Sequence, residues 1–87
     1  MAELLLPSGL VALFPGMPRR MTVSGTSVRE IIDVLEAERP GIADRIRIPG
    51  GDLRPNLRVF VDREPATLTT PVGPASVVQL LLATAGG

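Results

Sequence analysis

The sequence contains no cysteine, histidine, lysine, tyrosine or tryptophan, and all nine of its basic residues are arginines. Without cysteine and histidine, the chain has no thiolate nucleophile, no imidazole base and none of the soft ligands that hold transition metals. It also has no disulfide framework. These absences exclude most catalytic chemistry, so we expect neither a catalytic residue nor a metal site in this chain.

The charged residues are balanced, with nine acidic and nine basic side chains and a formal net charge of zero. No run of basic residues could follow a phosphate backbone, so nucleic acid is not an expected partner. No stretch approaches the roughly 20 apolar residues that a membrane span needs, and the apolar residues 4–14 lack the positive start of an export signal. We therefore expect a soluble cytoplasmic protein, and a length of 87 residues fits one domain.

Apolar patterning predicts one main helix with strands on both sides of it in the chain. Ser27 followed by Glu30 forms a capping box, and apolar residues then recur at helical spacing until Pro40. A further short helical turn is expected between Ile42 and Ile46. The predicted strands lie within residues 3–6, 17–24, 57–61, 66–68 and 77–82, of which 66–68 is a short edge segment.

This order of elements fits an α+β protein of the β-grasp type, with a mixed sheet of four or five strands covered by one main helix. The first two strands are expected to form an antiparallel hairpin, whose connecting loop packs down through Leu10, Leu13 and Phe14. The last strand is expected beside the first in the centre of the sheet, with a right-handed crossover through the helix. The domain is predicted to cover residues 1–82, and residues 83–87 to form a flexible tail.

Strand alternation divides the apolar residues into an inward and an outward set. The outward set leaves Leu5, Phe60 and Leu81 facing water, with Arg58 and Gln79 at their rim. We expect these five residues to form one partner-binding patch, because burial of apolar surface drives association while polar edges set orientation. The alternative is that they are scattered exposed side chains without a role. The inward set, expected to form the core, is Leu4, Leu6, Met21, Val23, Val28, Ile31, Ile32, Leu35, Leu57, Val59, Val61, Val78 and Leu80.

The chain finishes with a run of small residues, Ala83 to Gly87, directly after an apolar strand. Gly86 and Gly87 have no Cβ, so they present the thinnest possible chain and tolerate nearly any backbone angle. This pattern favours a tail that delivers the carboxylate of Gly87 into the narrow site of another protein. The alternative is an ordinary frayed terminus.

With this order of elements, the capping box, the strand end Val59-Phe60-Val61-Asp62 and the final Ala85-Gly86-Gly87, the sequence resembles the ubiquitin-like sulfur-carrier family. Its members include the small subunit of molybdopterin synthase and the sulfur carriers of thiamin and cysteine synthesis. The resemblance covers nearly the whole chain, although only the tail is a specific motif. Residues 35–46 resemble the molybdopterin and cysteine branches, whereas Leu82 and Thr84 depart from the proline and valine usual there, so the branch stays open.

The resemblance implies a sulfur carrier in which a ubiquitin-activating-like enzyme consumes ATP to adenylate the Gly87 carboxylate. Sulfur from a sulfurtransferase or another source then replaces the adenylate, and the resulting thiocarboxylate donates sulfur to an acceptor biosynthetic enzyme. Ala85 and Gly86 belong to the tail that enters the partner's site. The chain is then a cosubstrate that binds no cofactor itself, not an enzyme. An α-carboxylate with a pKa of about 3.5 is ionised at neutral pH and is a poor electrophile until a leaving group is attached.

Two other functions remain open at this stage. A ubiquitin-like protein modifier would share the adenylation step and then join Gly87 to target lysines through an isopeptide bond. Because the chain has no lysine, it could not build polymers of itself in this way. A β-grasp interaction module that is never activated would have no use for the free Gly-Gly end.

Overall fold

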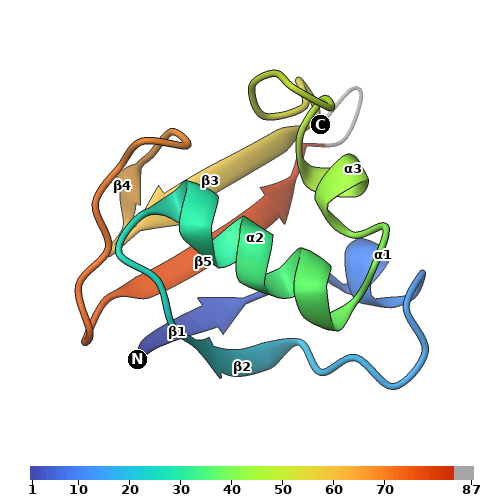
Figure 1. The fold of residues 1–87 in the computed structure, drawn as a ribbon, viewed down its shortest axis with the longest axis horizontal. Helices are drawn as coiled ribbons and strands as arrows, with labels where there is room; N and C mark the ends of the chain where they lie inside the picture. The colour runs from blue at the N-terminus through green and yellow to red at the C-terminus, as the bar shows by residue number, and fades with distance from the viewer. Residues whose placement is uncertain (84–87) are drawn as a thin grey trace.

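The computed structural model describes residues 1–83, in which helices cover one face of a five-stranded mixed sheet (Figure 1). The strand order is β2-β1-β5-β3-β4, with β1 and β5 parallel and the other neighbours antiparallel. The expected β-grasp fold, with the last strand beside the first in the centre of the sheet, is confirmed. The elements are β1 (Ala2–Leu5), α1 (Ser8–Val11), β2 (Arg20–Val23), α2 (Val28–Glu38), α3 (Ala43–Ile46), β3 (Leu57–Val61), β4 (Glu64–Pro65) and β5 (Val77–Leu82).

Helix α2 begins where the capping box predicted. The Ser27 hydroxyl accepts a hydrogen bond from the Glu30 backbone N–H at 3.2 Å. The Glu30 carboxylate accepts from the Thr26 backbone N–H at 2.8 Å and from its hydroxyl at 3.0 Å, so the box closes on the residue before the cap. Both bonds lower the pKa of Glu30 from its ordinary value, and the bond from the Thr26 backbone has the larger effect.

Glu36 ties α2 to α3. Its carboxylate accepts hydrogen bonds from the Gly41 N–H at 3.0 Å and from the Ala43 N–H at 2.9 Å. Both bonds lower the pKa of Glu36 from its ordinary value, and the bond from Gly41 has the larger effect. Asp33 and Arg47 add an ion pair between the same two segments at 3.5 Å. These contacts hold α3 against α2, although Pro40 and Gly41 prevent the two from forming one continuous helix.

The core lies between α2 and the sheet and consists of aliphatic side chains, with no buried polar or charged residue among residues 1–83. All predicted inward residues are buried except Met21, which is half-buried and packs against the cluster. The core also contains residues outside the predicted set, namely Ala2, Leu10, Met17, Ile42, Ala43, Ile46, Leu68 and Val72.

Two local expectations are wrong. The short edge strand β4 is Glu64–Pro65 rather than 66–68, because Asp62 (φ 50°) and Arg63 (φ 71°) alone complete the turn after β3. Positive φ at both central residues is the geometry of the two-residue turns that suit twisted hairpins.

The loop after β1 contains the four-residue helix α1, which is too short to produce a periodic signal in the sequence. Leu13 was expected to pack down in this loop, but it is 51% exposed.

Candidate functional site

The five residues predicted as a partner-binding patch lie together on the face of the sheet opposite α2. Leu5 pairs with Gln79, and Gln79 pairs with Phe60, so these three form one row across β1, β5 and β3. Leu81 pairs with Arg58 in the next row on that face. Paired residues point to the same side of a sheet. We call Leu5, Arg58, Phe60, Gln79 and Leu81 the open-face patch.

Gln79 was predicted at the rim of the open-face patch, but it lies in the middle, because β5 is the central strand and Gln79 pairs with Leu5 on one side and with Phe60 on the other. Leu81 is 39% exposed, Leu5, Phe60 and Gln79 are half-buried, and Arg58 is exposed. The Arg58 guanidinium donates to the Pro55 carbonyl at 2.7 Å, which directs it toward the start of β3. Apolar side chains thus surround a central amide, and such a mixture of apolar and polar surface is usual in reversible protein interfaces.

Two hollows flank the middle of this face and make it uneven. One, of about 300 Å³, has Leu5 and Gln79 on one side and Arg19 and Arg20 on the other. The second, of about 420 Å³, lies between Leu5, Gln79 and the turn at residues 62–63. The face is therefore hollowed on both sides of the Leu5–Gln79 pair, with arginines beside each hollow.

The end of β5 is held by contacts from two other segments. The Ala83 N–H donates to the Asn56 carbonyl at 2.7 Å, which extends the pairing with β3. Leu82 has the inward phase of β5, opposite buried Leu57, yet it is 36% exposed. Helix α1 approaches it closely, because a Cβ at Gly9 would lie 2.9 Å from Leu82 Cδ1. Glycine at position 9 thus lets α1 pack against the strand end.

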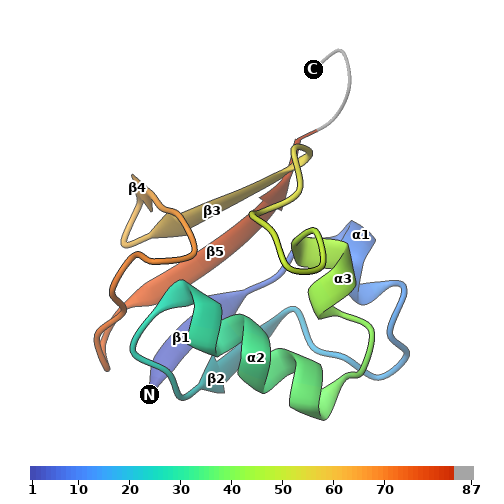
Figure 2. The same cartoon turned by 45° about the horizontal axis from the view of Figure 1, so that its top comes forward.

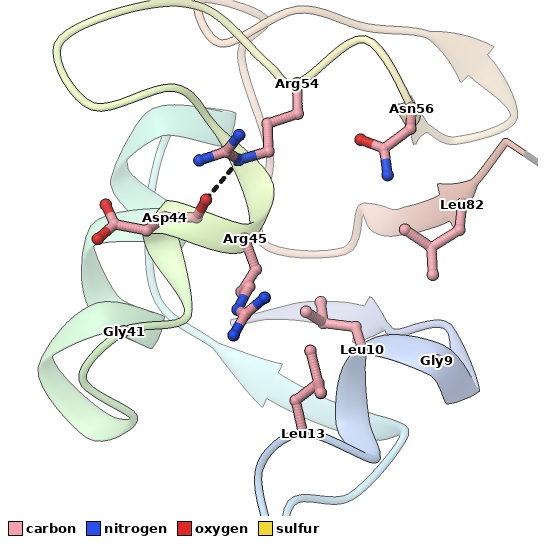
Figure 3. A pocket seen from close by; sticks show the side chains of 9 residues that line it. All are labelled: Gly9, Leu10, Leu13, Gly41, Asp44, Arg45, Arg54, Asn56 and Leu82. Carbon is pink, nitrogen blue, oxygen red and sulfur yellow. Dashed lines mark hydrogen bonds between the residues drawn. The ribbon is translucent and has the colours of Figure 1, made fainter.

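A pocket of about 680 Å³ opens at this strand end (Figure 3). It lies between α1, α3 and the segment before β3, whose backbone arrangement Figure 2 shows. We call it the strand-end pocket. It was missed at the level of sequence, because its residues come from four separate segments and share no motif. Its lining is Gly9, Leu10, Leu13, Gly41, Asp44, Arg45, Arg54, Asn56 and Leu82.

The predicted sulfur-attachment residue Gly87 and the tail residues Ala85 and Gly86 lie outside the described residues 1–83. Their roles stay predictions. What the structure places is the point where β5 ends, between the open-face patch on one side and the strand-end pocket on the other.

Within residues 1–83, no group of three or more histidine, cysteine or acidic side chains is arranged to hold a metal ion. In the same part of the chain, no helix is long and apolar enough to cross a membrane.

No protein-family model and no curated protein sequence matches the chain. Solved structures do. A chain of the Amycolatopsis orientalis BexX/CysO complex matches with a TM-score of 0.87 and 25% identity, covering 100% of both chains. CysO from Mycobacterium tuberculosis, described as an antigen, matches with a TM-score of 0.85 and 24% identity over 97% of this chain and 100% of its own. SAMP1 from Haloferax volcanii matches with a TM-score of 0.76 and 24% identity over 99% of this chain and 98% of its own.

These matches cover essentially the whole of both partners in each comparison, so the likeness is one of complete folds and not of a shared fragment. The chain has the β-grasp fold of ubiquitin-like proteins, and the resemblance to ubiquitin-like sulfur carriers that its sequence suggested is confirmed at the level of structure.

Proposed function

We propose that this chain is a cytoplasmic ubiquitin-like sulfur carrier whose Gly87 carboxylate is activated and converted to a thiocarboxylate. The observation that supports this most is the combination of a β-grasp domain with a Gly-Gly end five residues beyond its central strand β5. Gly-Gly can enter a narrow site that side chains would block. The described part of the chain supplies a recognition surface for the enzymes that act on that end.

In the proposed cycle, a ubiquitin-activating-like enzyme binds the chain together with ATP. A Gly87 carboxylate oxygen attacks the α-phosphorus of ATP, pyrophosphate leaves, and an acyl adenylate forms. Sulfide from a donor can then attack the acyl carbon, so that AMP leaves and the thiocarboxylate results directly. If the donor is the persulfide of a sulfurtransferase, the same attack expels AMP and forms an acyl disulfide. A second thiol then attacks the outer sulfur of that transferase, which releases the thiocarboxylate and leaves a disulfide between the thiol and the transferase. An acceptor enzyme takes the sulfur for molybdopterin, cysteine or another sulfur-containing metabolite. The chain itself acts as a cosubstrate, since the sulfur nucleophile and the phosphate ligands come from its partners.

The open-face patch is the proposed binding surface for the activating and acceptor enzymes. The Amycolatopsis orientalis structure is a complex of CysO with BexX, which supports association with a partner protein as part of the function. A protein modifier is the second candidate, because one matched Haloferax volcanii structure is that of small archaeal modifier protein 1, with a TM-score of 0.75 and 22% identity.

The test is reconstitution with the activating enzyme encoded by the same genome. ATP–pyrophosphate exchange should depend on the chain, and removal of Gly87 or a Gly86→Leu substitution should abolish it while the thermal midpoint stays unchanged. Exchange at the wild-type rate with either variant would contradict the role of the tail. No exchange with the wild-type chain would leave a β-grasp interaction module. Adding a sulfur source distinguishes the other two functions, because a carrier yields a thiocarboxylate and a modifier yields adducts on target lysines.

A further inference from the structure

The strand-end pocket is a surface that the open-face patch does not include. Its apolar part is formed by Leu10, which is 3% exposed and forms the floor, and by Leu13 and Leu82 at 51% and 36% exposure. Large aliphatic side chains that remain this exposed beside a hollow are typical of binding surfaces. Figure 3 shows Leu10, Leu13 and Leu82 on the same side of the pocket.

Two arginines, Arg45 and Arg54, line the same pocket. Among residues 1–83 the ion pairs are Arg20–Glu3 and Arg47–Asp33, so Arg45 and Arg54 are not neutralised by a side chain of that part. Arg54 Nε donates to the backbone carbonyl of Asp44, which fixes its guanidinium at the pocket wall.

Asp44 is the acidic residue of the lining, and Figure 3 shows its carboxylate pointing away from the leucines. The hollow thus combines an apolar floor with two guanidinium groups. A guanidinium is planar and binds carboxylates through paired hydrogen bonds. The complementary ligand therefore carries a negative charge next to an apolar group.

The place of the pocket identifies the partner. Four residues take the chain from Ala83 to Gly87, and four residues reach at most about 14 Å even when fully extended. An enzyme that acts on Gly87 must therefore lie beside the strand-end pocket. Leu81 and Leu82 are consecutive and point to opposite faces of β5, so the pocket continues directly from the open-face patch around the strand end.

We propose that the strand-end pocket binds a segment of the activating enzyme in which an Asp or Glu side chain lies next to a large apolar one. The apolar side chain packs between Leu13 and Leu82, and the carboxylate pairs with Arg45 and Arg54. This inference rests on the proposed function and adds a second contact to it, one that depends on charge. Held on both faces of β5, the strand end has a fixed position relative to the partner's active site.

The test measures the dissociation constant of the complex with the activating enzyme at low and at high salt. Arg45→Glu is the main variant, because Arg45 is exposed and reversal of its charge should not affect folding. Arg29→Glu is the matched control, since Arg29 is an exposed residue of α2 outside the strand-end pocket and the substitution makes the same charge change. Leu13→Ser tests the apolar part. Thermal midpoints establish that all variants fold.

We expect Arg45→Glu to weaken binding about tenfold at low salt and to reduce its salt dependence, because charges at an interface rim act through long-range attraction. Leu13→Ser should weaken binding several-fold without changing the salt dependence. Arg29→Glu should match the wild type. Equal binding by the Arg45→Glu and Arg29→Glu variants overturns the inference while the sulfur-carrier function stands. A wild-type chain that the enzyme neither binds nor adenylates overturns the proposed function, and the inference with it.

Discussion

The two faces of the sheet use the same strands for different purposes. On the face under α2, Leu4, Val59 and Val78 are at most 3% exposed and belong to a continuous aliphatic core. On the other face, Leu5 and Phe60, which alternate with them along β1 and β3, remain half-buried with no layer of the described chain covering them.

The difference shows which apolar residues folding requires and which it does not. Burial of the inner residues supplies the main driving force for folding, at roughly 25 cal/mol per Å² of apolar surface. The outer residues contribute less to folding, because part of their apolar surface stays exposed until another protein covers it. Substitutions on the inner face should therefore change stability, and substitutions on the outer face should change partner binding.

The largest effect is expected on the inner face. Leu35→Ala should lower the free energy of unfolding by about 2 to 4 kcal/mol, because it leaves a cavity where α2 meets the sheet. Val59→Ala removes fewer atoms and should fall at the lower end of this range. Chemical denaturation measures both. Wild-type stability in both variants would mean that the inner face is not the source of folding free energy.

Phe60→Ser changes the outer face of β3, at the residue after Val59. It should weaken binding to the activating enzyme by about 2 kcal/mol, or roughly thirtyfold, because a central aromatic anchor can contribute that much to an interface. Its cost to folding should be smaller than that of Leu35→Ala, since Phe60 is only half-buried. Unchanged affinity would show that the open-face patch is not an interface.

The turn between β3 and β4 should yield a gain in stability. Arg63 has φ 71°, a conformation that is costly for residues with a Cβ and free for glycine. Arg63→Gly should raise the free energy of unfolding by about 0.5 to 1 kcal/mol. Arg63→Ala is the matched control, because it removes the side chain but keeps the Cβ. An equal gain from both would attribute the effect to the arginine side chain instead of the backbone.

The smallest effect is expected at Glu36, on the helix side. Its pKa is lower in the folded chain, so its contribution to stability is complete above the ordinary glutamate value of about 4.3 and is lost as the pH falls through the lowered value. Glu36→Gln should therefore be less stable than the wild type at pH 7 and lose less stability on acidification below pH 4. Glu30 retains part of the acid sensitivity in both proteins, because its pKa is lowered too.

Glu38→Gln on the same helix is the control for this experiment. Glu38 is exposed, and no hydrogen bond to its carboxylate forms among residues 1–83. Thermal midpoints from pH 3 to 7 make the comparison. Identical pH profiles for the wild type and Glu36→Gln would contradict a role of this carboxylate in joining α2 to α3.

Most of the fold could be predicted because its long elements have strong local signals. Apolar residues at positions 57, 59 and 61 set the phase of β3, and the single polar residue Gln79 in the apolar run 77–82 set that of β5. The pair Ser27 and Glu30 located the start of α2. The open-face patch followed from the same alternation, because a period of two determines both faces at once.

The features that were missed depend on contacts between distant segments or on single backbone angles. Helix α1 is only four residues long. Strand β4 begins earlier in the sequence than predicted, because two non-glycine residues adopt positive φ. Leu82 pairs with buried Leu57, but it is 36% exposed and lines the strand-end pocket. Arg45 and Arg54 reach the same hollow only through the path of the chain between α3 and β3.

The central claim is that sulfur is bound at Gly87, and the intact mass of the protein purified from its native cell tests it most directly. We predict a population heavier than the sequence mass by the replacement of one oxygen with sulfur, and tandem fragmentation should locate the difference at Gly87. Oxidation of Met1, Met17 or Met21 adds nearly the same mass, so the fragments that contain these residues should keep the mass of the unmodified sequence. Only the unmodified mass, in cells that are actively making sulfur-containing metabolites, would contradict the account.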